Sequence, residues 1–172
     1  MKKILVIVSL FALNWQASAQ SLERRNELKI CLAHLLAGSL KVGYERLLND
    51  FSSVGASGFY SFSNLNHHRS SSRGLEGQLL GFYRLYFGQQ PISGFFLEGN
   101  LGLNWIRHYT WSAGVSRRSY DAAFGVGIAL GWKWYIPRTG IVLDVFAGGG
   151  RLFGSDHQNA FPRAGISIGR RF

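Results

Sequence analysis

Residues 121–136 decide the fold, because their side chains alternate strictly between two kinds over the whole stretch Asp121-Ala122-Ala123-Phe124-Gly125-Val126-Gly127-Ile128-Ala129-Leu130-Gly131-Trp132-Lys133-Trp134-Tyr135-Ile136. The even positions, 122 to 136, are apolar and mostly large, whereas the odd positions are mostly glycine or alanine with an occasional charge. A period of two is the pattern of a β-strand, and a helix would mix the two sets. Each interior glycine would also cost a helix about 1 kcal/mol relative to alanine. The stretch therefore predicts a long strand with one apolar face.

The same alternation recurs along the chain and predicts an all-β protein. Apolar residues alternate with small or polar residues in about eight segments, near residues 28–33, 40–45, 54–62, 75–86, 95–105, 121–136, 141–148 and 163–172. Short turns are expected at 49–50, 89–91 and 137–139, and longer polar loops at 63–73, 108–118 and 153–161. The connection at 37–38 is the one short turn expected on the long-loop side. Short turns at one end and longer loops at the other are typical of an up-and-down antiparallel barrel.

Composition favours a barrel in a membrane over a soluble domain. The 172 residues are enough for one domain, and they are 47% hydrophobic but only 16% charged, with 22 glycines. Soluble domains carry about 25% charged residues. The net charge of +10 comes from scattered rather than clustered lysines and arginines, so we expect no nucleic-acid partner. Cys31 is the single cysteine, which excludes an intrachain disulfide.

The first residues have the pattern of a secretory signal peptide. Lys2 and Lys3 precede an apolar run over 4–13, and Ala17-Ser18-Ala19 is a small-residue cleavage site. We expect residues 1–19 to be removed, which leaves a barrel of residues 20–172.

Charge decides which face of the predicted strands meets lipid. A lysine or arginine on the lipid face at the bilayer midplane costs about 2–4 kcal/mol, so the polar face must point into the lumen. This gives a predicted lumen charge network of Lys41, Glu45, Glu76, Arg84, Glu98, Asp121, Lys133 and Asp144. With Lys29, Arg163 and Arg171 the inward charges number six positive and five negative, which predicts a lumen that is nearly neutral and closed by ion pairs.

Aromatic residues are expected near both ends of the strands, as in the interfacial girdles of membrane barrels. One belt, on the short-turn side, comprises Phe87, Phe95, Trp132, Trp134 and Phe172. The other, on the long-loop side, comprises Tyr60, Phe62, Trp105 and Trp111. A soluble sandwich or lipocalin-like barrel with ordinary core aromatics is the alternative interpretation.

Several short motifs resemble a family of small Gram-negative outer-membrane β-barrel proteins of unknown function. They are Asn26-Glu27-Leu28-Lys29, Gly43-Tyr44-Glu45-Arg46, Phe82-Tyr83-Arg84-Leu85-Tyr86-Phe87, Gly131-Trp132-Lys133 and Leu143-Asp144. The architecture is similar to the barrels of outer membrane proteins X and A. The ending resembles the signal read by the barrel assembly machinery, with apolar residues at alternate positions before a terminal aromatic, here Ile166, Ile168 and Phe172. Arg170 departs from that pattern, which has an aromatic or apolar residue two places before the end.

The resemblance implies an eight-stranded transmembrane β-barrel in the outer membrane, with lipid around it. Six arginines on the expected outer side suggest contact with lipopolysaccharide phosphates, because guanidinium groups bind phosphate in bidentate fashion. They are Arg69, Arg73, Arg107, Arg117, Arg118 and Arg151. A solvated basic loop face is the alternative. We expect a structural or envelope-integrity role or a surface interaction, with a narrow channel as the alternative.

Catalysis is not expected. A lipid A deacylase of this barrel class uses histidine and serine two residues apart, and His68 and Ser70 have that spacing. They lie early in the chain, in a serine-rich loop where such a match arises easily by chance. No motif for a cofactor, metal or small-molecule substrate is recognised; His67 and His68 are expected to be solvated and Cys31 to fill space in the lumen.

Overall fold

The computed structural model describes residues 24–36, 38–61, 73–88, 92–112, 115–154 and 159–172. Of residues 73–74, 107–112 and 115–120 it describes the backbone alone. The expected signal peptide, residues 1–19, lies outside the described residues. In the described part of the chain no helix is long and apolar enough to cross a membrane.

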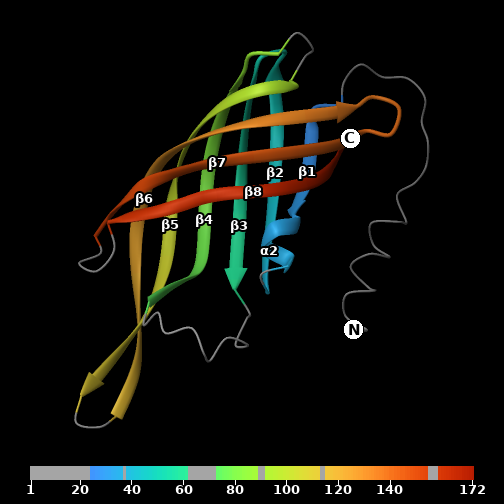
Figure 1. Ribbon diagram of the computed structural model, residues 1–172. Coiled ribbons are helices and arrows are strands. Elements are labelled where there is room, and N and C mark those ends of the chain that lie inside the picture. Colours follow the sequence, from blue (N-terminus) through green and yellow to red (C-terminus); the bar gives the residue numbers. More distant parts are fainter. Residues whose placement is uncertain (1–23, 37, 62–72, 89–91, 113–114, 155–158) are drawn as a thin grey trace, which may run out of the picture.

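Eight strands form a closed antiparallel barrel in which every strand pairs with its sequence neighbours and β1 pairs with β8 (Figure 1). The elements are β1 (Asn26–Cys31), α2 (Leu32–Leu36), β2 (Ser39–Asn49), β3 (Ser52–Ser61), β4 (Arg73–Tyr86), β5 (Gly94–Ser112), β6 (Val115–Ile136), β7 (Ile141–Phe153) and β8 (Ala160–Arg171). This confirms the predicted fold class, an eight-stranded up-and-down barrel. We call the end with the β2–β3, β4–β5 and β6–β7 connections the turn side, and the opposite end the loop side.

Three local predictions were wrong. Leu32 and Ala33, expected to continue the first strand, begin the short helix α2 instead. The segment 108–118, expected to be a loop, is mostly hairpin: β5 and β6 stay paired to Ser112↔Val115 and project beyond the barrel (Figure 1). Leu75 packs inside against Leu80 and its neighbours, because a β-bulge between Leu75 and Gly77 shifts the alternation of β4.

The two faces of the wall differ as the alternation predicts. Along β8, inward residues such as Arg163 and Ser167 are buried, while Ile166 and Ile168 between them are exposed. β6 behaves in the same way: Lys133 is buried and Ile128, Leu130 and Trp132 are exposed. The charged side chains of these two strands therefore lie inside the barrel, and the exposed outer face is apolar.

Candidate functional site

Glu45 is the centre of a buried polar network inside the lumen. It lies on β2 and is fully buried. Its carboxylate accepts hydrogen bonds from five side chains on four other strands. Ser53 Oγ and Tyr86 Oη each donate to Oε1 at 2.5 Å, and Lys133 Nζ donates to the same oxygen at 2.7 Å. The other oxygen, Oε2, accepts from Lys29 at 2.5 Å and from Arg84 at 3.0 Å.

Arg84 connects the centre of the network to two further carboxylates. Its Nη1 donates to Asp144 Oδ2 at 2.7 Å as well as to Glu45, and its Nε donates to Glu98 Oε2 at 2.9 Å. Lys29 also binds Asp144 Oδ2, at 2.7 Å. These side chains come from β1, β2, β4, β5 and β7, so the network joins strands from opposite parts of the wall.

Glu27 completes the network on the turn side, and the predicted set did not include it. It is fully buried and forms ion pairs with Lys29 at 2.8 Å, Lys133 at 2.9 Å and Arg171 at 2.7 Å. The signal was present in the sequence, because Glu27 lies two residues before Lys29 and so shares its face. The predicted first segment began one residue too late to include it.

The structure divides the predicted lumen residues into three groups. Ion pairs join Glu45, Arg84, Glu98, Lys133 and Asp144, and Arg163 adds a pair to Glu98. Lys41 is buried in the lumen but beside an aromatic ring, with its Nζ 5.3 Å from the centre of the Phe146 ring.

Glu76 and Asp121 form the third group, at the loop-side rim. Both are half-buried, and Glu76 is the extra residue of the β4 bulge. The predicted balance of six positive and five negative charges therefore does not describe the buried network, where Glu27 replaces these two carboxylates.

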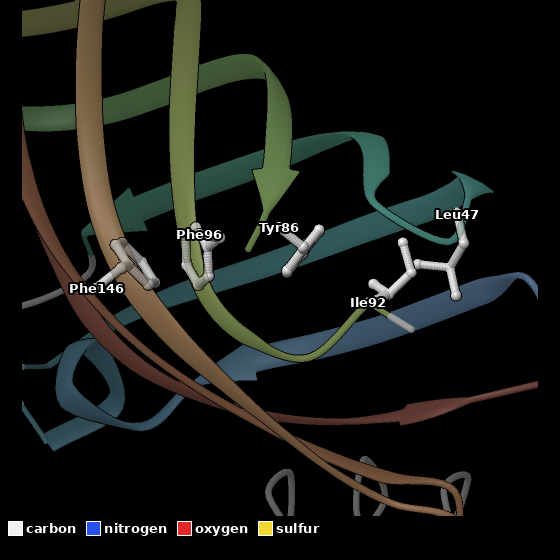
Figure 2. Close-up of a cluster of buried hydrophobic side chains, with 5 residues drawn as sticks. All are labelled: Leu47, Tyr86, Ile92, Phe96 and Phe146. Carbon is white, nitrogen blue, oxygen red and sulfur yellow. The ribbon is translucent and has the colours of Figure 1, made fainter. Parts of the chain in front are cut away.

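An apolar cluster packs beside the ion pairs and reaches the turn-side end of the lumen. A cluster of buried residues joins Leu47, Tyr86, Ile92, Phe96 and Phe146 (Figure 2). Figure 2 shows Ile92 on the β4–β5 connection next to Leu47 of β2. Its backbone N–H donates to the Asp50 carbonyl at 3.0 Å, and its φ of 47° is rare for a β-branched residue. Ile92 is thus held at the turn-side end of the lumen.

A second apolar cluster lies on the loop side of the lumen. It consists of Leu80, Ile106, Ala123, Leu152 and Phe161, with Leu75 packed against it. Large rings fit inside so narrow a barrel because glycines face them: a Cβ at Gly131 would overlap Phe96. The two apolar clusters and the ion pairs together fill most of the described lumen.

The outer face of the barrel is apolar between its two ends. Among the described outward side chains of the strands, the charged ones are Arg46, Arg151 and Arg170, all close to strand ends. Between them the exposed residues are large and apolar, such as Val126, Ile128 (66% exposed) and Leu130.

Exposed aromatic residues gather towards both ends of this face. On the turn side they include Phe51, Phe87, Phe95, Trp132, Trp134 and Phe172, and on the loop side Tyr60, Trp105, Phe124 and Phe153. Phe62 and the Trp111 side chain, which complete the predicted loop-side belt, lie outside the described residues.

Of the six arginines predicted to face lipopolysaccharide, the structure describes the side chain of Arg151. It lies on the outward, exposed face of β7 near the loop side, 5.7 Å from the centre of the Phe153 ring. Arg73 on β4, Arg107 on β5, and Arg117 and Arg118 on β6 have described backbones in strands, although Arg73, Arg117 and Arg118 were expected in loops. Arg69 lies outside the described residues, as do His67, His68 and Ser70.

The residues of the predicted assembly signal lie on the outer face of β8 and at its end. Ile166 and Ile168 are exposed, and so is Phe172. The Phe172 N–H donates to the Asn26 carbonyl at 2.8 Å, and the Asn26 N–H donates back to Phe172 at 3.1 Å. The C-terminus is therefore held at the seam where β8 meets β1.

Comparison with known proteins gives no family. No family model matches the chain, and no curated protein matches it significantly. Two solved structures are similar to it. The N-terminal β-barrel domain of Pseudomonas aeruginosa OprF shares 15% identity over 87% of this chain and 98% of that one, with a TM-score of 0.49. Neisserial surface protein A shares 12% identity over 86% of this chain and 95% of that one, also with a TM-score of 0.49.

Proposed function

We propose that this protein is a small outer-membrane β-barrel with a structural or surface-interaction role. Residues 1–19 direct its export and are then cleaved, and residues 20–172 form the barrel in the membrane. The observation that carries the proposal is the outer face, where the described side chains between the strand ends are apolar and uncharged. A soluble barrel would place these residues in water, whereas a bilayer favours them.

The height of the apolar face fits a bilayer. From Phe124 to Trp134 the outward residues of β6 are all apolar and exposed. These positions span about 34 Å along the strand at about 3.4 Å per residue. A strand tilt of about 40° reduces this to about 26 Å along the barrel axis, close to the apolar band of about 25 Å in outer-membrane barrels.

Charge substitutions at two depths test the membrane proposal. Ile128→Arg places a charge in the middle of the face, and Ile136→Arg, on the same face of the same strand, places it at the turn-side end. In a bilayer the first should cost about 2–4 kcal/mol of folding free energy and the second about 0–1 kcal/mol. A soluble lipocalin-like barrel would tolerate both equally. The wild-type protein should also be found in the outer-membrane fraction, and on a gel it should migrate differently before and after boiling.

A structural role is favoured over a channel because side chains fill the lumen. Arg84, Lys133 and the carboxylates between them are buried and joined by ion pairs, and Ile92 packs at the turn-side end of the lumen. An eight-stranded barrel has an interior just wide enough for side chains to fill. We expect no steady conductance in planar bilayers; reproducible open steps, enlarged in Ile92→Gly, would support the channel instead.

Lipopolysaccharide is the proposed partner of the loop side. The proposal rests on the excess of arginine in that part of the sequence and on the outward position of Arg151. Replacing Arg69, Arg73, Arg107, Arg117, Arg118 and Arg151 with glutamine should reduce the lipopolysaccharide that copurifies with the barrel. Unchanged copurification would show that the arginines are merely solvated.

The proposed biogenesis partner is the barrel assembly machinery, through Ile166, Ile168 and Phe172. Catalysis is not part of the proposal. Release of fatty acid from lipid A by the purified protein, abolished in His68→Ala and Ser70→Ala, would replace it with an enzymatic function.

A further inference from the structure

A small cavity lies inside the lumen and plays no part in the role proposed above. It has a volume of about 30 Å³, enough for one or two particles of the size of water. Its lining includes Cys31, Lys41, Ser57, Phe146, Arg163 and Ser167. These side chains come from strands β1, β2, β3, β7 and β8, so the cavity lies between inward-facing side chains of the barrel wall.

The ion pairs beside this cavity do not balance in charge. Four carboxylates, those of Glu27, Glu45, Glu98 and Asp144, are paired with five cations. The five cations are Lys29, Arg84, Lys133, Arg163 and Arg171. The network that the described residues form therefore carries one positive charge in excess.

Lys41 adds a second excess positive charge. Its side chain is buried, yet among the described residues no carboxylate lies within ion-pair distance of its Nζ. Its contact is with the Phe146 ring, and the same ring has the Arg163 guanidinium 5.3 Å and the Arg84 guanidinium 5.7 Å from its centre. An aromatic face offsets a desolvated cation by about 2 kcal/mol, far less than the cost of burying an uncompensated charge.

Hydrogen-bonding groups without a partner line the same cavity. Within the described part of the lumen, Arg163 Nη1 and Ser57 Oγ are buried and make no hydrogen bond. Arg163 is 2% exposed and Ser57 6% exposed, so bulk water does not satisfy them. Both can donate, as can the Lys41 ammonium.

The carboxylates of Glu45 and Asp144 also line the cavity and would repel an anion, and Asp144 Oδ1 makes no hydrogen bond. Its partner oxygen, Oδ2, is already bound by Lys29 and Arg84. The register places Asp144 opposite Ser167, four residues from Arg163 towards the turn side. The loop-side part of the cavity therefore keeps the excess positive charge.

We propose that this cavity binds a small monovalent inorganic anion, with chloride as the reference ligand, held by Lys41, Arg163 and Ser57. The anion neutralises part of a buried charge excess that the carboxylates leave uncompensated. Its donors are already buried on strands of the wall, so binding requires little reorganisation.

The Cys31 thiol is the competing source of negative charge. It lines the cavity, and its Sγ lies 3.1 Å from Nδ1 of His34 on α2. If the thiol gave up its proton, the protein would supply its own anion at this place. The experiment must therefore separate a bound halide from a thiolate.

The test uses the full barrel refolded in zwitterionic detergent. Chloride-35 NMR line broadening measures binding directly, and the unfolding equilibrium is compared in sodium chloride and sodium gluconate at equal ionic strength. Gluconate screens charge equally but is too large for a cavity of about 30 Å³. At a chloride concentration 100 times its Kd, the unfolding constant should fall by about 100-fold relative to gluconate.

Three variants test whether the chloride effect arises at this cavity. Lys41→Met should lose the line broadening and the chloride dependence, while folding at least as well as wild type in gluconate because an unpaired buried charge is gone. Lys41→Arg should keep the dependence, and Cys31→Ser should keep it too. Equal behaviour of the wild type in the two salts overturns the proposal. So does chloride dependence that first appears in Cys31→Ser, since the thiolate would then be the native counter-charge. If Lys41→Met fails to fold, the wild-type titration and Cys31→Ser decide alone.

Discussion

Replacing Glu45 with glutamine should destabilise the barrel strongly while leaving its shape almost unchanged. The substitution is nearly isosteric, but it removes a negative charge that faces Lys29, Arg84 and Lys133 at 2.5–3.0 Å. It also replaces one acceptor oxygen by a donor NH₂ group. Because Glu45 is fully buried, water cannot take over the lost interactions.

The size of the effect follows from the three cations left behind. Removing one partner of a buried ion pair costs about 3–5 kcal/mol, because the remaining charge stays buried without compensation. Glu27 and Asp144 still bind Lys29, and Glu98 still binds Arg84, which limits the loss. We therefore expect Glu45→Gln to cost about 3–5 kcal/mol of unfolding free energy.

The assay is reversible urea unfolding of the barrel in lipid vesicles, followed by tryptophan fluorescence and by the shift on an unboiled gel. Asp50→Asn, which removes a carboxylate from the exposed turn after β2, is the matched control and should change the free energy by less than about 0.5 kcal/mol. The double variant Glu45→Gln with Lys133→Met should recover part of the loss. An unfolding free energy of Glu45→Gln within 1 kcal/mol of wild type would refute the view that this network holds the lumen together.

Three further predictions concern packing, hydrogen bonding and assembly. Gly131→Ala should cost about 1–3 kcal/mol because the added Cβ would overlap a lumen aromatic ring, whereas Gly58→Ala, with nothing within 4 Å of its Cβ, should be neutral by the same urea titration. Tyr86→Phe should lower the free energy of unfolding by about 1.5–3 kcal/mol, because the Tyr86 hydroxyl donates to Glu45 at 2.5 Å. A variant as stable as the wild type would contradict that hydrogen bond. Deleting Phe172 should slow insertion by reconstituted assembly machinery several-fold while leaving unassisted refolding in detergent nearly unchanged; equal slowing of both would instead indicate a structural role at the β1–β8 seam.

Strict alternation made the wall of the barrel predictable from sequence. In residues 121–136 every outward position is alanine or a large apolar residue, and such a pattern has one stable arrangement in a barrel with a filled lumen. The inward positions of Glu45, Arg84, Glu98, Lys133 and Asp144 follow from the same parity. Their mutual pairing does not, because it depends on the stagger between strands, which parity does not reveal.

Departures from strict alternation explain the errors in the fold. The bulge in β4 adds one residue, Glu76, between Leu75 and Gly77. Glycine occurs in every strand from β2 to β8, so Gly77 did not distinguish the bulge and Leu75 was assigned to the wrong face. The hairpin beyond Trp105 consists mainly of polar residues. Because membrane strands are expected to have an apolar face, these residues were interpreted as a loop. The backbone pairing of its two strands satisfies their hydrogen bonds without an apolar face, so they extend well past the barrel.

The closure of the turn side was not predictable from sequence either. Ile92 lies in a connection, between a proline and a serine. Outside a strand there is no alternation from which the direction of an apolar side chain can be predicted. Its buried position goes with the hydrogen bond from its N–H to the Asp50 carbonyl, a contact between residues far apart in the chain. Contacts of this kind are made by tertiary packing.

The central claim, that the outer face of this closed barrel meets lipid, is tested most directly by spin labels on β6. In a Cys31→Ser background, labels at the outward positions Val126, Ile128 and Leu130 are compared with labels at Phe124 and Ile136 in reconstituted vesicles. We expect the collision rate with lipid-soluble oxygen, relative to that with a water-soluble nickel chelate, to rise towards Ile128 and Leu130 and to fall towards both ends. Free access of the nickel chelate to all five positions would contradict it.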